Sequence, residues 1–270
     1  MHGASRRWGL AVVVGVALGA FAAAAAAPPP RPLADLDLAK AFATKSAWRL
    51  TVLQGFPGPD PYYPEEQVPG AVRLCLKKAG SGPCDPAVRS MAQPPPDMAP
   101  DAWEPHYLGV ARVVRPRGPA AAPLLLVQTL SLHSGDGDQA IYTQLLAYRQ
   151  GEDRFTPIYA HMTGRNNNQD TRFMASGPLA GSVISAEPTN NAPFGFWITV
   201  HRLTPAYRYE QVLRYRSATH YADGNPLAVI DSEMPNIQLR LGLWKPGQPL
   251  PLPAGRCPKP RLVKMELWCG

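Results

Sequence analysis

The stretch 124-LLLVQTLSLHSGDGDQAIYTQLLAYR-149 decides the fold of this chain. Residues 124–133 and 141–148 are two runs rich in leucine, each with a threonine, and the second also contains Ile141 and two tyrosines. They flank residues 134–138, Ser-Gly-Asp-Gly-Asp, a composition that is typical of a hairpin turn. The first run is long and almost continuously apolar, which indicates a fully buried strand. The sequence therefore predicts a buried antiparallel hairpin.

Shorter runs on both sides of this hairpin alternate between apolar and polar residues, a pattern typical of half-buried strands. Prolines and glycines separate these runs at the intervals expected of a β-sandwich or barrel. The clearest runs cover residues 48–52, 72–77, 194–201, 207–216 and 237–243. The sequence therefore predicts an all-β fold, an antiparallel β-sandwich or jelly roll. One short N-terminal helix is expected over residues 33–42, where apolar residues recur at helical spacing.

The N-terminus has the features of an export signal. Residues 1–27 contain no acidic residue, carry Arg6 and Arg7 near their start, and continue as a short apolar, alanine-rich run before three prolines. A retained membrane anchor is the alternative, since residues 8–27 just reach the length of about 20 residues that a span needs. Alanine and glycine make this run weakly apolar, which favours cleavage. We expect a signal peptide over 1–27, a linker with the short helix over 28–44, and a single β-rich domain over 45–270.

The four cysteines lie in the part of the chain that follows the signal peptide. An even number in an exported protein predicts two disulfides, and a local pairing of Cys75 with Cys84 and Cys257 with Cys269 is the simplest of three possibilities. Structural zinc is the alternative, but it prefers cysteines separated by about two to four residues. The spacing here is wider in both pairs. We therefore expect disulfides and no metal.

Three carboxylates could perform chemistry: Glu210, Asp231 and Glu233. If residues 229–234 form a strand, Asp231 and Glu233 share one face, as the paired carboxylates of glycoside hydrolysis would. Asp231-Ser232-Glu233 is similar to the last three positions of the Glu-x-Asp-x-Glu strand of laminarinase-like glycosidases. That resemblance implies a carbohydrate hydrolase on a β-sandwich. Val229 occupies the position of the nucleophilic glutamate in that family.

A structural interpretation of the same carboxylates is the alternative. In a β-meander, Asp231 and Glu233 would lie close to arginines on neighbouring strands, namely Arg214, Arg216 or Arg240. An arginine–carboxylate pair in a half-buried sheet satisfies the hydrogen-bonding groups of both side chains. On this interpretation Asp231 and Glu233 hold the sheet together and take no part in catalysis.

Aromatic residues and arginines gather near the same strands and suggest a binding surface. Aromatic rings stack on sugar rings, and guanidinium groups bind carboxylates or phosphates. The candidates are Tyr207, Arg208, Arg214, Arg216 and Trp244. Regular alternation along residues 207–216 would place the tyrosines and the arginines on opposite faces of the strand, so the two kinds of residue would not act together.

The charge balance indicates the class of partner, and the absence of a complete catalytic motif favours binding over catalysis. The formal net charge of the chain is +7, and the basic residues are scattered singly along the sequence. Such a distribution favours an anionic envelope polymer or glycan over nucleic acid. We expect a periplasmic or secreted envelope protein that needs no cofactor and is not an integral membrane protein after cleavage. Its function is expected to be non-catalytic binding or structural support; the alternative is a secreted carbohydrate-active hydrolase that uses the paired carboxylates.

Overall fold

The fold is built almost entirely from strands. Strands account for 52% of the described residues and helices for 8%, in several antiparallel sheets, so the all-β prediction is confirmed. The predicted signal peptide, residues 1–27, lies outside the described residues. The computed structural model describes residues 30–61, 63–78, 82–89, 104–116, 122–133, 139–164, 170–189, 195–220, 223–253, 255 and 257–270.

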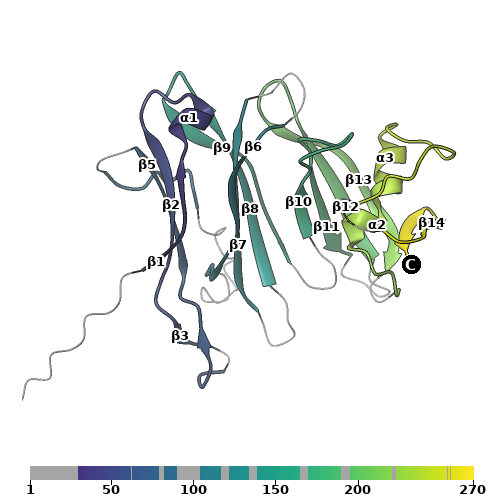
Figure 1. Ribbon diagram of the computed structural model, residues 1–270, viewed down its shortest axis with the longest axis horizontal. Coiled ribbons are helices and arrows are strands. Elements are labelled where there is room, and N and C mark those ends of the chain that lie inside the picture. Colours follow the sequence, from purple (N-terminus) through teal and green to yellow (C-terminus); the bar gives the residue numbers. More distant parts are fainter. Residues whose placement is uncertain are drawn as a thin grey trace, which may run out of the picture.

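Three antiparallel sheets lie side by side (Figure 1). The first sheet, in the order β1-β2-β5, consists of Arg31–Asp37, Trp48–Gln54 and Val72–Lys78. The second sheet, in the order β6-β7-β8-β9, consists of Tyr107–Val114, Leu124–His133, Gln139–Arg149 and Arg154–Gly164. The third sheet, in the order β10-β11-β12-β13, consists of Asp170–Phe173, Val183–Pro188, Gly195–Leu203 and Tyr209–His220.

A layer of short elements covers the far side of the third sheet (Figure 1). It consists of the helices α2 (Val229–Ser232) and α3 (Met234–Arg240) and the hairpin of β14 (Pro260–Val263) and β15 (Glu266–Cys269). The remaining elements are the helix α1 (Ala39–Phe42) and the paired strands β3 (Gly58–Pro59) and β4 (Gln67–Val68). Among the described residues, no helix has the length and hydropathy that would let it cross a bilayer.

The predicted central hairpin is present as β7 and β8, which pair antiparallel with Leu124 opposite Ala147. Its turn, residues 134–138, lies outside the described residues. Both faces of this hairpin are buried. Leu125 packs in a core shared with the first sheet, whereas Leu126 and Leu145 pack in a core with Val183 of the third sheet. Burial on both faces explains why the sequence of these strands is almost continuously apolar.

The helix predicted over residues 33–42 is wrong over its first half. Arg31–Asp37 is the strand β1, and only Ala39–Phe42 is helical. The register of β1 against β2 shifts between Pro32 and Ala34, so Leu33, Ala34 and Leu36 all pack against the core. A bulge of this kind interrupts the alternation of a strand and gives apolar residues a spacing that resembles that of a helix.

The strands predicted over residues 229–234 and 237–243 are also wrong, because these segments form α2 and α3. Ile230, Met234 and Ile237 are buried against the third sheet, and their spacing of four and three residues marks one side of a helix. Pro235 lies in the first turn of α3, where a proline starts a helix without losing a hydrogen bond. The apparent alternation in this region therefore came from two short helices.

Both predicted disulfides are present. Cys75 pairs with Cys84 and Cys257 pairs with Cys269, each with 4.9 Å between the Cα atoms. The first closes the loop that follows β5, and the second ties β15 to the preceding loop. Each closes a short loop, which in the chain-entropy account stabilises a fold by about 3 kcal/mol.

Asp153, in the turn between β8 and β9, connects the second sheet to the first. Its carboxylate accepts hydrogen bonds from Ser46 Oγ at 2.5 Å, Tyr148 Oη at 2.7 Å and Trp48 Nε1 at 3.0 Å. It also forms an ion pair with Lys78 Nζ at 2.9 Å. Hydrogen bonds from Ser46, Lys78 and Tyr148 hold the pKa of Asp153 well below its usual range. This contact set fixes both the sheet packing and the position of the turn.

We predict that Asp153→Asn lowers the Tm at pH 7, because asparagine cannot pair with Lys78 and has only one acceptor oxygen. A carboxylate with a depressed pKa gives stability that is present above the unfolded-state value of 3.8 and is lost as pH falls through the folded-state value. The parent protein should therefore lose more stability than the variant between pH 4 and pH 2. Thermal melts over this range measure both effects.

The matched control is Asp35→Asn. Asp35 pairs with Arg49 at 2.6 Å, but both side chains are about half exposed. An exposed pair contributes little to stability, so this variant should melt close to the parent. Equal Tm values for the parent and Asp153→Asn at pH 7 would contradict the assignment.

Candidate functional site

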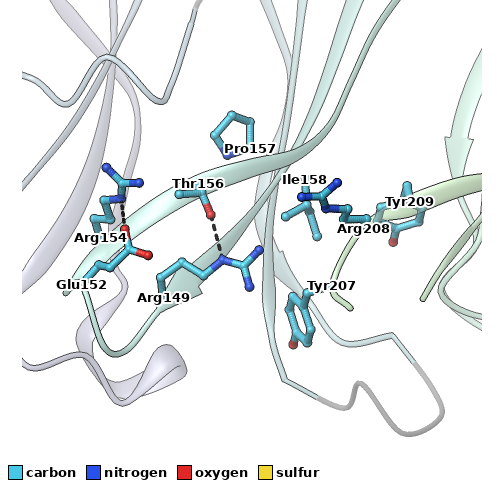
Figure 2. A pocket seen from close by; sticks show the side chains of 9 residues that line it. All are labelled: Arg149, Glu152, Arg154, Thr156, Pro157, Ile158, Tyr207, Arg208 and Tyr209. Carbon is cyan, nitrogen blue, oxygen red and sulfur yellow. Dashed lines mark hydrogen bonds and ion pairs between the residues drawn. The ribbon is translucent and has the colours of Figure 1, made fainter. Parts of the chain in front are cut away.

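Two turns that are distant in the sequence line one open pocket of about 610 Å³ (Figure 2). The turn between β8 and β9 supplies Arg149 and Arg154, and the turn between β12 and β13 supplies Tyr207 and Arg208. Tyr209, at the start of β13, also lines it. In Figure 2 the guanidinium groups of Arg149 and Arg208 extend toward each other from opposite sides. We call this the arginine–tyrosine pocket.

The turn that carries Tyr207 is tight. The amide of Tyr207 donates to the carbonyl of Thr204 at 2.9 Å, and the amide of Thr204 donates to the carbonyl of Arg208 at 2.8 Å. Tyr207 has a φ of 60°, in the left-handed region that bulky residues rarely adopt. Such residues persist only where the surrounding structure holds them, and they cluster at functional sites.

The pocket is positively charged. Its three guanidinium groups face one carboxylate, Glu152, which pairs with Arg154 at 2.6 Å. Arg149 Nε donates to Thr156 Oγ1 at 3.2 Å, and its guanidinium lies 5.7 Å from the centroid of the Tyr207 ring. Within the part of the chain that the structure describes, the Arg208 guanidinium has no hydrogen-bond or ion-pair partner. An anion in this pocket would therefore meet an unpaired guanidinium group.

The tyrosines complement this charge. Burial raises the pKa of Tyr207 and of Tyr209, so both phenols are neutral at physiological pH and do not repel an anion. Tyr209 Oη donates to the carbonyl of Gly181 at 2.8 Å. The hydroxyl of Tyr207 has no partner among the described residues. Aromatic rings beside guanidinium groups suit a ligand that has both a ring and a negative charge.

The structure separates the predicted binding residues into three places. Tyr207 and Arg208 line the pocket. Arg214 and Arg216 are exposed farther along β13. Trp244 is buried, and its Nε1 donates to the carbonyl of Pro249 at 2.9 Å, so it packs inside the protein.

The expectation that regular alternation separates the tyrosines from the arginines of β13 holds for Tyr215, which packs with α2 and α3, and fails for Tyr209. Val200 is opposite Leu213, whereas His201 is opposite Gln211, so Val212 is an extra residue in β13. A bulge of one residue exchanges the faces of all positions beyond it. Tyr209 and Arg214 consequently lie on the same face of the third sheet.

Sequence reasoning missed Arg149 and Arg154, which face Arg208 across the pocket. The available signal was two arginines that flank the segment Gln150-Gly151-Glu152-Asp153, a turn composition at the end of the central hairpin. Nothing in the local sequence, however, indicates that this turn meets residues 204–208.

The three candidate carboxylates do not converge. Glu210 is exposed on β13, opposite Arg202. Asp231 Oδ1 accepts from Arg172 at 2.7 Å, and Arg172 also pairs with Asp170 at 3.0 Å. Asp231 thus reaches β10, at the edge of the third sheet opposite β13. The predicted pairing of Asp231 with Arg214, Arg216 or Arg240 is wrong, because α2 directs the side chain to the other edge.

Glu233 is fully buried and points to β13. Its carboxylate accepts hydrogen bonds from Tyr215 Oη at 2.7 Å, Thr219 Oγ1 at 2.7 Å and Asn236 Nδ2 at 3.1 Å. Its predicted pairing with an arginine is wrong as well, since Arg240 stacks over the Tyr215 ring at 4.4 Å. Asp231 and Glu233 therefore fasten α2 to opposite edges of the third sheet. The structural interpretation therefore stays a prediction, with Arg172, Tyr215, Thr219 and Asn236 as the partners in place of the expected arginines.

Comparison with known proteins identifies no relative. No protein-family model matches the chain, and no curated protein and no solved structure matches it significantly.

We predict that Glu233→Gln destabilises the protein far more than Asp231→Asn. The first change leaves buried donors without an acceptor, which should cost roughly 2 to 3 kcal/mol. The second leaves Arg172 paired with Asp170 at a partly exposed position and should cost about 1 kcal/mol. Chemical denaturation of both variants beside the parent measures the difference. A Glu233→Gln protein at least as stable as the parent would show that Glu233 is not a structural anchor.

Proposed function

We propose that this chain is a non-catalytic envelope protein that binds an anionic glycan in the arginine–tyrosine pocket. The observation that carries the proposal is the meeting of Arg149, Arg154 and Arg208 with Tyr207 and Tyr209 in one open pocket. Guanidinium groups bind carboxylates and phosphates in a planar, bidentate geometry, and tyrosine rings pack on sugar rings. A charged sugar presents both groups together.

The chemistry of the pocket supports binding without catalysis. The pocket has one carboxylate, Glu152, and it forms an ion pair with Arg154. A carboxylate that is paired in this way is a poor candidate for a catalytic acid or base. Glycoside hydrolysis needs two carboxyl groups on either side of the scissile bond. Glu210, Asp231 and Glu233 do not line the pocket, and each of the last two is held by other side chains.

Binding should depend on the unpaired Arg208. We predict that Arg208→Ala weakens binding of trigalacturonate, an acidic sugar probe, about tenfold, which corresponds to roughly 1.4 kcal/mol. Binding should also weaken as salt increases, because exposed charges are screened. Fully methyl-esterified trigalacturonate, which keeps the rings and loses the charge, should bind far more weakly. Isothermal titration calorimetry measures all three.

The matched control is Arg73→Ala, which removes an exposed arginine from β5 in the first sheet. This variant should bind like the parent, since it changes net charge equally and leaves the pocket intact. Equal affinity of Arg208→Ala and the parent, or release of reducing ends from the probe, would refute the proposal.

The compartment forms part of the proposal. The two disulfides are compatible with an oxidising compartment, and the acid-free, alanine-rich start of the chain is typical of an export signal. A periplasmic or secreted protein would meet the acidic polymers of an envelope.

We predict that expression in a Gram-negative host yields a periplasmic protein that begins near Ala27. Mass spectrometry of the intact protein from the periplasmic extract tests this. Recovery of the chain in the membrane fraction with residues 1–27 still attached would instead support the retained anchor.

A further inference from the structure

The third sheet carries a second group of aromatic and arginine side chains outside the pocket. Among the described tryptophans, Trp197 of β12 is the one that is exposed, with 37% of its surface accessible. The guanidinium of Arg214 stacks on its ring, 4.7 Å from the centroid, and Arg216 is directly opposite Trp197 in the register of β12 and β13. We call Trp197 with Arg214 and Arg216 the tryptophan platform.

Hydrogen-bonding groups lie directly beside this platform. Glu187 of β11 is opposite Trp197 on the other side of β12. Its Oε1 lies 2.8 Å from His161 Nε2 of β9 and accepts from Ser185 Oγ at 3.1 Å. The side chains of Glu187 and His161 are each about one-third exposed. An exposed indole ring beside a carboxylate and an imidazole offers a sugar both a stacking face and partners for its hydroxyl groups.

The platform and the pocket lie along the same side of the third sheet. The bulge at Val212 places Tyr209 and Arg214 on one face. Between them, the Tyr159 ring of β9 contacts the rings of Tyr209 at 5.5 Å and His201 at 5.4 Å. Leu203 is opposite Tyr209, and Trp197 is six residues away along β12, a distance of about 20 Å at the rise of a strand.

We propose that the tryptophan platform is a second sugar-binding subsite and that the ligand is an acidic glycan chain that spans it and the arginine–tyrosine pocket. The inference rests on the proposed function, because it takes the pocket as the first subsite. Single sugars are too short to reach both. Joining two weak subsites through one ligand makes the second contact intramolecular, so affinity should increase strongly once the chain is long enough.

The test is the binding of oligogalacturonates from one to eight sugars by isothermal titration calorimetry. For the parent, affinity should increase tenfold or more once the oligomer spans both subsites. Trp197→Ala should lose this gain and still bind the trimer like the parent, whereas Trp197→Phe, which keeps a ring, should retain most of it. Arg208→Ala should bind every length more weakly.

Arg261→Ala is the matched control, because Arg261 stacks on Trp268 at 5.9 Å in the β14–β15 hairpin, away from both subsites. It should bind all lengths like the parent. A length-dependent gain that survives in Trp197→Ala, or no gain in the parent, would overturn the second subsite and leave the pocket in place. Unchanged trimer binding by Arg208→Ala, or no binding at any length, would refute the pocket and the second subsite together.

Discussion

Burial of the second sheet on both faces determines where every other layer lies. Leu125 and Leu126 are neighbours in β7, yet they pack in different cores, one shared with the first sheet and the other with the third. A strand with two apolar faces must be covered on both sides, because each exposed apolar face would lose the free energy of burial. The third sheet in turn has an apolar outer face of its own, which α2 and α3 cover.

The proposed ligand sites lie where this layering ends. β9 is the edge strand of the second sheet and packs beside β10 and β11 of the third, so the exposed side chains of β12 and β13 extend beyond it. Arg214 and Arg216 lie there with Trp197. The pocket forms at the turns. Asp153 connects the β8–β9 turn to the first sheet, and this connection restricts the positions of Arg149 and Arg154. A rigid support under binding residues lowers the entropy cost of ligand binding.

The sequence was informative wherever local pattern and tertiary environment agree. The central hairpin, the alternation of β12 and the local disulfides each depend on residues close together in the chain, so they could be predicted. The bulges could not be predicted: the one in β1 gave a false helix signal, and the one at Val212 placed Tyr209 on the same face as Arg214. The pocket was half predictable, because Tyr207 and Arg208 are adjacent while Arg149 and Arg154 come from a turn more than 50 residues earlier.

The same contacts that stabilise the fold also leave the proposed binding surface basic. Several acidic residues have internal partners: Asp153 is held by Trp48 and Lys78 of the first sheet, Asp231 by Arg172, and Glu233 by Tyr215 and Thr219. Burial, followed by the charges of Glu233 and Asp223, raises the pKa of Glu266 to about 7, so this carboxyl is partly neutral as well. Among the described residues, these carboxylates form no ion pair with Arg208, Arg214 or Arg216. The net charge of +7 is modest, but guanidinium groups are in local excess beside aromatic rings. An acidic sugar chain could bind to both kinds of group.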